Sequence, residues 1–222
     1  MKKQTPNRMP VLNFKRYQPL GLRVWHWLNA LAVTGLLLTV LLHNTFLNPR
    51  KNAALIQEKL SASGTTVSIE LARKAAGAMR ERMFEWHYYF GFLLTGAFLI
   101  RVIVGLVQSE FPWQHILIGI RHFRKSDAAD KRSAFHFTVV KTGYLTFYIA
   151  ALVMILTGLP MYFSDALGIT KEKHHTLQEI HEFFLWYFVG FLVIHIVGVV
   201  VAELSGHRGI ISDMIHGGDK DS

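Results

Sequence analysis

Residues 181–195 read HEFFLWYFVGFLVIH, so two histidines enclose an apolar stretch that contains a single charged residue, Glu182. Fourteen residues make almost four helical turns, which places both imidazoles on one face of a helix about 21 Å apart along its axis. An ionisable ring in hydrocarbon is costly unless it faces the interior of a bundle and finds a partner there. We therefore interpret His181 and His195 as functional residues of a membrane helix.

The rest of the chain has room for three more such helices. It has 222 residues, 51% of them hydrophobic, and a mean hydropathy of +0.26. Four segments lack Lys, Arg, Asp and Glu: Val24–Leu42, Trp86–Ile100, Thr142–Phe163 and Phe183–Ala202. We predict an all-α integral membrane protein, a four-helix transmembrane bundle made by one domain over residues 1–222. The predicted spans are about 20–43, 83–108, 138–163 and 179–203.

Composition excludes several classes of site. The chain has no cysteine, which rules out disulfides, thiolate-ligated iron–sulfur clusters and covalently attached c-type haem. Any cofactor must be held by nitrogen or oxygen. The net charge is +9, but the basic residues cluster at the ends of the spans, where they set topology and contact lipid headgroups. We therefore expect membrane lipid, and no nucleic acid, as a partner.

The distribution of basic residues predicts the orientation. With an N-inside arrangement, fourteen Lys and Arg lie on the cytoplasmic side and nine on the outer side, which favours cytoplasmic termini in a bacterial inner membrane. The extramembrane loop 44–82 is long enough to have structure of its own, with Ser68 as a helix N-cap. Residues 108–132 are interpreted as a cytoplasmic elbow on the membrane surface, and the tail beyond Glu203 as a short interfacial helix.

Alternating helix direction sorts four histidines into two levels. His26 and His195 lie near the cytoplasmic ends of the first and fourth spans, whereas His87 and His181 lie near the outer ends of the second and fourth. Two imidazoles on opposite sides of one iron make a six-coordinate b-type haem that transfers single electrons. Gly91, one turn after His87, would let a porphyrin lie close to the backbone. The bundle is thus predicted to enclose two b-type haems.

Two arginines are candidate haem contacts. Arg101 lies fourteen residues after His87, on the same helix face and at the depth of His195, so a haem propionate is one partner for it. The alternative is that Arg101 extends to the cytoplasmic headgroups. Arg23 lies one turn before His26 and either clamps the same haem or anchors the end of the helix.

Two further histidines border the spans. His43 lies seventeen residues after His26 and about 100° from its helix face, so we do not expect the two to share a haem face. His136 lies at the cytoplasmic start of the third span near Lys141, where it is a candidate for binding or protonating a quinone.

These residues resemble the four-helix di-haem cytochrome b subunits of nickel–iron hydrogenases and respiratory formate dehydrogenases, which are grouped with the small bacterial cytochrome b561 proteins. The matching stretches are Arg23-Val-Trp-His26-Trp-Leu-Asn29, His87-Tyr-Tyr-Phe-Gly91 followed by Arg101, Thr157-Gly158, and Glu179-Ile-His181-Glu182 leading to His195. The resemblance implies two haems b, ligated by His26 with His195 on the cytoplasmic side and by His87 with His181 on the periplasmic side. It also implies a periplasmic iron–sulfur or cytochrome electron-transfer partner, and a quinone near the inner haem.

The chain departs from these relatives in two places. The quinone contacts that formate-dehydrogenase relatives carry ahead of the third helix are not evident in Ser133–Lys141. The first loop is extended, and we interpret it as a docking element for the partner.

Three functions compete. The first is an electron-transfer subunit that connects a hydrogenase-like or dehydrogenase-like partner to quinone, with substrate chemistry in the separate partner. The second is a stand-alone cytochrome b561-type quinone oxidoreductase that oxidises superoxide or another small donor. The third is a divalent-metal transporter, which the lack of intramembrane carboxylates disfavours.

Overall fold

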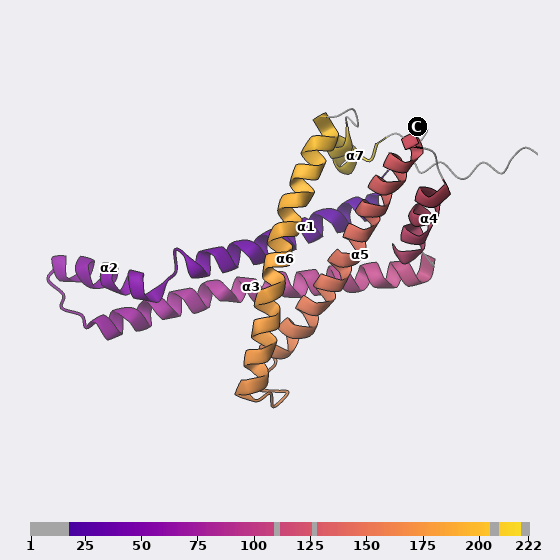
Figure 1. Ribbon diagram of the computed structural model, residues 1–222. Helices are drawn as coiled ribbons and strands as arrows, with labels where there is room; N and C mark the ends of the chain where they lie inside the picture. The colour runs from indigo at the N-terminus through magenta and orange to yellow at the C-terminus, as the bar shows by residue number, and fades with distance from the viewer. Residues whose placement is uncertain (1–17, 109–111, 126–127, 205–208, 219–222) are drawn as a thin grey trace, which may run out of the picture. The chain divides into compact units, whose positions relative to one another are not determined.

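The computed structural model describes residues 18–108, 112–125, 128–204 and 209–218, and within them every element of secondary structure is helical (Figure 1). The helices are α1 (Leu20–Asn44), α2 (Pro49–Ala62), α3 (Ile69–Gln108), α4 (Pro112–Lys125), α5 (Ala128–Tyr162), α6 (Lys171–Leu204) and α7 (Ile210–His216). The predicted all-α class is confirmed.

Four helices are long and apolar enough to cross a membrane. These candidate helices are Leu20–Asn44, Ile69–Val107, Phe137–Tyr162 and Lys171–Leu204. Large apolar side chains stand exposed along them, for example Val107, Phe183 and Ile194. Exposed apolar surface of this extent is costly in water and normal against lipid. The chain is therefore a multi-pass membrane protein, as the charge-free segments predicted.

The helices are distributed over two compact units. Unit 1 comprises residues 1–23, 98–154 and 190–222, and unit 2 comprises residues 24–97 and 155–189. Each of the four long helices contributes one segment to each of the two units. The helix α2 belongs to unit 2, and α4 and α7 belong to unit 1. The single-domain organisation over residues 1–222 stays a prediction.

In unit 2, the predicted loop 44–82 is a helical hairpin made by α2 and the first turns of α3. Asn48 caps α2, because its side-chain oxygen accepts from the backbone N–H groups of Arg50 and Lys51 at 3.1 and 3.4 Å. The turn that follows α2 contains Gly64 at φ +83°, a conformation that glycine adopts without strain. Ser68 then accepts from Leu71 N–H at 3.2 Å, which confirms the predicted N-cap.

The hairpin closes through small side chains. Ala53 of α2 and Ala72 and Ala76 of α3 are each 1% exposed, and Gln57 donates to the Val67 carbonyl at 2.9 Å. The second span was predicted at about 83–108, and the helix α3 that contains it runs without interruption for 40 residues. At 1.5 Å per residue that is about 60 Å, roughly twice the hydrocarbon thickness, so an upright helix of this length extends beyond the membrane.

The membrane part of unit 2 brings α1 against α3. A Cβ added at Gly35 of α1 would lie 2.7 Å from the Phe90 ring, so glycine is required for this close approach. Trp25 Nε1 donates to the Ala97 carbonyl at 2.9 Å and joins the same two helices farther along.

In unit 1, aromatic side chains join α5 to its neighbours. Phe147 of α5 packs on Phe191 of α6 with ring centroids 5.1 Å apart, and Tyr148 meets Phe98 of α3 at 6.4 Å. Near the end of α6, Glu203 accepts from Gly209 N–H at 2.8 Å, a bond that links α6 to the residue before α7. The short helix predicted in the tail is confirmed, and α4 lies within the predicted elbow.

We predict that Ala76→Leu loosens the hairpin. A larger side chain in a closed seam costs about 1–3 kcal/mol through overpacking, so the turn between α2 and α3 should be cleaved faster by a protease added from the outer side. Ala75→Leu, one position away and exposed, is the matched control. Equal cleavage rates for the two variants would show that the alanine seam does not hold the hairpin together.

Candidate cofactor site

Two of the four predicted histidines meet inside unit 2. His87 of α3 and His181 of α6 have ring centroids 6.3 Å apart, with their planes inclined by 64°. They are 94 residues apart in sequence, and the structure brings their rings together, whereas their role as ligands of one haem stays a prediction.

Each ring is held by a threonine from another helix. Thr39 Oγ1 of α1 lies 2.9 Å from His87 Nδ1, and Thr157 Oγ1 of α5 lies 2.8 Å from His181 Nδ1. Both threonines are buried, at 2% and 5% exposure. All four long helices therefore contribute one residue to the site, two through imidazoles and two through the hydroxyls that orient them.

The hydrogen count at Thr39 assigns the tautomer of His87. The Thr39 hydroxyl donates to the Leu36 carbonyl at 2.7 Å, and a hydroxyl has only one hydrogen to donate. In the contact with His87, Nδ1–H is consequently the donor and Thr39 the acceptor. Nε2 then keeps a free lone pair, which is the form of imidazole that binds a metal.

The separation of the rings fits one metal bound between them. An imidazole nitrogen bonds a metal at about 2.0 Å. A five-membered ring with bonds near 1.35 Å has a radius of about 1.15 Å. Two imidazoles that ligate one metal from opposite sides therefore have centroids about 6.3 Å apart, which is the distance found here. The two histidines are thus far enough apart to hold one metal ion, such as a haem iron, between them.

Close packing fixes both rings. Phe84, one turn before His87 on α3, stacks on its imidazole at 4.8 Å with planes 8° apart. On the other side, a Cβ added at Gly158 of α5 would lie 3.2 Å from His181 Cε1, so only glycine gives this ring its full space. The Thr157-Gly158 pair thus both holds and accommodates His181.

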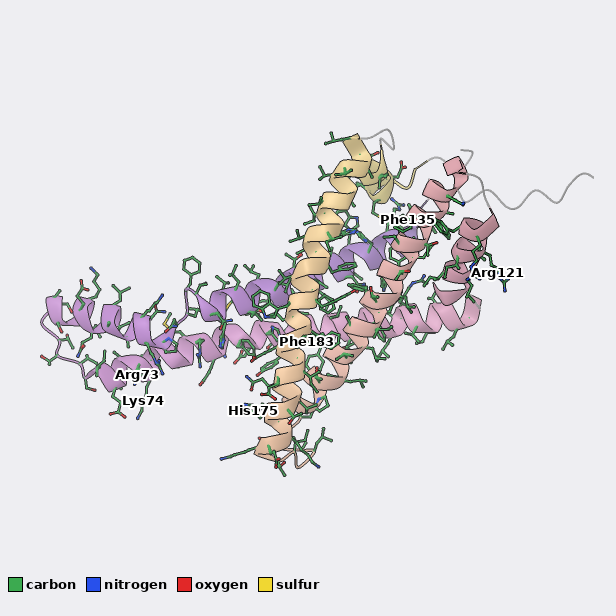
Figure 2. All side chains as sticks on the ribbon, viewed as in Figure 1. Arg73, Lys74, Arg121, Phe135, His175 and Phe183 are labelled. Atoms are coloured by element: carbon green, nitrogen blue, oxygen red, sulfur yellow. The ribbon has the colours of Figure 1, made fainter. Side chains whose placement is uncertain are left out.

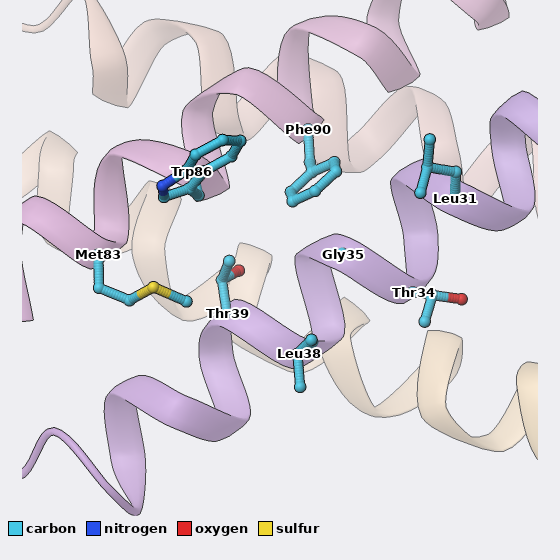
Figure 3. Close-up of a pocket in the computed structure, with 8 residues that line it drawn as sticks. All are labelled: Leu31, Thr34, Gly35, Leu38, Thr39, Met83, Trp86 and Phe90. Carbon is cyan, nitrogen blue, oxygen red and sulfur yellow. The ribbon is translucent and has the colours of Figure 1, made fainter.

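An apolar cavity of about 300 Å³ lies beside the site, between α1 and α3 (Figure 3). It is lined by Leu31, Thr34, Gly35, Leu38, Thr39, Met83, Trp86 and Phe90. Neither histidine lines it, so it is separate from the space between the two rings. Thr39 is the one residue that belongs to both.

The other predicted pair is divided between the units. His26 belongs to unit 2, where its ring meets Trp27 edge to face at 5.4 Å. His195 belongs to unit 1, where Phe191 stacks parallel to it at 6.0 Å. The pairing of His26 with His195 stays a prediction.

The two arginines both make hydrogen bonds within unit 1. In unit 1, Arg101 Nε donates to the Tyr148 hydroxyl at 3.2 Å. Arg23 Nη1 donates to the Ile215 carbonyl at 2.6 Å, and its guanidinium lies against Gly217. Arg23 thus joins the start of α1 to the C-terminal turn, as in the anchoring alternative.

Two further expectations concern the quinone role of His136 and the metal-transporter alternative. The side chain of His136 lies outside the described residues, so its quinone role stays a prediction. Within the described ranges, no group of three or more His, Cys, Asp or Glu is placed to hold a metal ion. The transporter alternative gains no support from that part of the chain.

Sequence reasoning missed the threonines as site residues. Thr157 appeared only within a family-like motif, and Thr39 not at all. The available signal was weak, because a threonine in a membrane helix commonly bonds to its own backbone. The pairing of each threonine with a histidine depends on which helices are neighbours.

Comparison with known proteins matches residues 17–217 to a family described as prokaryotic cytochrome b561. A probable Ni/Fe-hydrogenase B-type cytochrome subunit of Cupriavidus necator is 23% identical over 217 residues, covering 88% of this chain and 82% of the relative. Proteins of the same name from Rhodobacter capsulatus and Bradyrhizobium diazoefficiens are each 24% identical, covering 88% of this chain and 77% and 81% of their own lengths. No solved structure matches the chain.

Proposed function

Because the chain belongs to the prokaryotic cytochrome b561 family, we propose that it is a membrane b-type cytochrome that carries electrons between a partner oxidoreductase and the quinone pool. The relatives are named as cytochrome subunits of Ni/Fe-hydrogenases, which favours a hydrogenase-like partner. Substrate chemistry then takes place in that partner, and this chain is the electron-transfer subunit.

The observation that carries the proposal is the His87–His181 pair with both Nδ1 atoms on buried threonines. These two histidines are the proposed axial ligands of an outer haem b. Bound haem supplies a reversible one-electron redox centre with no open position for oxygen. Thr39 and Thr157 orient the ligands, and the surrounding apolar helices exclude water from them.

A second haem b is proposed at the inner level, with His26 and His195 as its ligands and Arg23 and Arg101 near its propionates. The support is the register of α6, where fourteen residues separate His181 from His195 on one helix face. A spacing of about 21 Å along the helix places the two irons in opposite leaflets. Electrons then cross the bilayer through two haems.

The electron acceptor is proposed to be a quinone near His136, at the cytoplasmic end of the apolar part of α5, Phe137–Tyr162. Lys141 supports this location, because its ammonium lies 5.4 Å from the ring centroids of both Phe137 and Tyr144. Such a group combines a hydrogen-bond donor with flat apolar surfaces, as a quinone headgroup requires.

The partner is proposed to dock on the hairpin of α2 and α3, on the periplasmic side. Residues 45–82 contain seven Lys and Arg against three Glu. Arg73 and Lys74 are exposed on the outer part of α3 (Figure 2). A basic surface steers an acidic partner toward productive contact. When the hairpin lies on the periplasmic side, both termini of the chain lie in the bacterial cytoplasm.

The alternative function is a stand-alone superoxide:quinone oxidoreductase. The names of the relatives favour an electron-transfer subunit over this enzyme. Purified protein that reduces quinone with superoxide and without a partner would reverse that preference.

We predict that His181→Ala removes the outer haem and leaves the inner haem in place. Haem content per chain should fall by half in a pyridine haemochrome assay, because one axial ligand set is broken. His175→Ala is the control, since His175 lies on the same helix and is exposed at its outer end (Figure 2). A His181→Ala protein that keeps its full haem content would refute the ligand assignment.

Thr39→Val should raise the reduction potential of the outer haem. Without an acceptor for Nδ1–H, the His87 imidazole is a poorer electron donor and stabilises ferric iron less. We also expect haem to be retained about tenfold less tightly. Thr95→Val is the matched control, because Thr95 is a part-buried threonine whose hydroxyl donates to the Gly91 carbonyl. Redox titration decides: equal potentials in the two variants would exclude the orienting role of Thr39.

Reversing the charges of Arg73 and Lys74 to Glu should weaken partner binding and flatten its salt dependence, with haem content unchanged. The control reverses Lys171 and Lys173, two exposed lysines at the start of α6. Association is measured by co-purification of the native complex at several salt concentrations. If both double variants bind the partner as the natural chain does, the hairpin is not the docking surface.

A further inference from the structure

Two buried nitrogens at the outer end of the cofactor site lack a partner. Among the residues that the structure describes, three side chains have a buried nitrogen without a hydrogen bond: Arg23 Nε, His43 Nδ1 and Arg80 Nε. His43 and Arg80 both belong to unit 2, and Arg80 lies within electrostatic range of His43. Buried donors are almost always paired, so an unpaired neighbouring set points to a group that the polypeptide itself does not supply.

Both residues lie directly outward of the histidine pair. Arg80 precedes His87 by seven residues, which is two helical turns, so it lies on the same face of α3 and about 10.5 Å farther out. The His43 ring, at the end of α1, packs against Phe84 at 4.8 Å, and Phe84 stacks on His87 at 4.8 Å. A single aromatic ring therefore separates His43 from the imidazole of His87.

The chemistry of the pair defines what would complete it. An arginine brings a permanent positive charge and a planar fork of N–H donors, and His43 adds a further donor from α1 in the tautomer that carries its proton on Nδ1. Within the described residues, Glu85 pairs with Arg82, Glu58 with Lys59 and Glu179 with His175, and no carboxylate pairs with Arg80. The missing partner is an acceptor with negative charge, and a carboxylate matches the arginine fork.

We propose that His43 and Arg80 anchor a propionate carboxylate of the haem that is held between His87 and His181. The inference rests on the proposed function, because it requires haem at that pair. Propionates are the charged groups of haem b besides iron, and they are stable only where hydrocarbon gives way to water or to cations. Arg80 and His43 supply such a place at the outer end of the site. His43 thus acts as a haem contact without being an iron ligand.

The test compares haem b with its dimethyl ester, which keeps the iron and the ring but has no carboxylate. Full-length protein carrying His195→Ala, which removes a proposed inner ligand, is depleted of haem in detergent and titrated with each pigment at the Soret band. This background should bind the free acid about tenfold or more tightly than the ester, as expected for charge-assisted hydrogen bonds. Adding Arg80→Gln should abolish that preference, and adding His43→Phe, which keeps a ring on Phe84, should reduce it.

Arg82→Gln is the matched control, because Arg82 is an exposed arginine of the same helix that pairs with Glu85 at 3.5 Å. It should keep the full preference for the free acid. Arg80→Lys keeps the positive charge without the planar fork of donors, so it should show an intermediate preference for the free acid. This variant replaces Arg80→Gln in the test if Arg80→Gln does not fold.

Three outcomes overturn the proposal. An unchanged preference in the Arg80 and His43 variants would mean that these nitrogens serve another anion, such as a lipid phosphate. Equal binding of acid and ester before any Arg80 change would exclude a propionate contact at this site. Failure of the His195→Ala background and of the natural chain to bind either pigment would instead refute the proposed haem function itself.

Discussion

An imidazole buried in hydrocarbon must have a partner for each of its two ring nitrogens. At His87 and His181 one nitrogen is satisfied by a threonine from α1 or α5, and the proposed function has a metal complete the other nitrogen of each ring. This requirement links fold and cofactor. The four long helices must gather so that each histidine meets its threonine, and the same arrangement sets the ring separation at 6.3 Å.

Much of this arrangement was predictable because a membrane imposes simple rules. Segments without charge must be helices, and a fourteen-residue spacing must place two histidines on one face. Depth alone then paired His87 with His181. The roles of Thr39 and Thr157 were not predictable, because a hydroxyl that bonds to its own helix looks the same in sequence as one that orients a ligand.

The outer end of unit 2 concentrates positive charge around an apolar centre. The basic hairpin lies farthest out, His43 and Arg80 follow, and the two histidines lie innermost with Phe84 beside them. In the proposed function this positive charge serves two purposes, because it attracts an acidic partner protein from solution and stabilises the propionates of bound haem. Both effects depend on basic residues in the same part of α3.

The unbroken helix α3 imposes a strict rule on how this part of the chain can change over evolution. Each residue added between Arg73 and His87 would turn the hairpin by about 100° and move it by about 1.5 Å relative to the histidine. An addition or loss of seven, eleven or eighteen residues restores the original facing to within about 20°. Homologues with longer or shorter hairpins should therefore differ by such numbers in this stretch, or should carry a compensating kink.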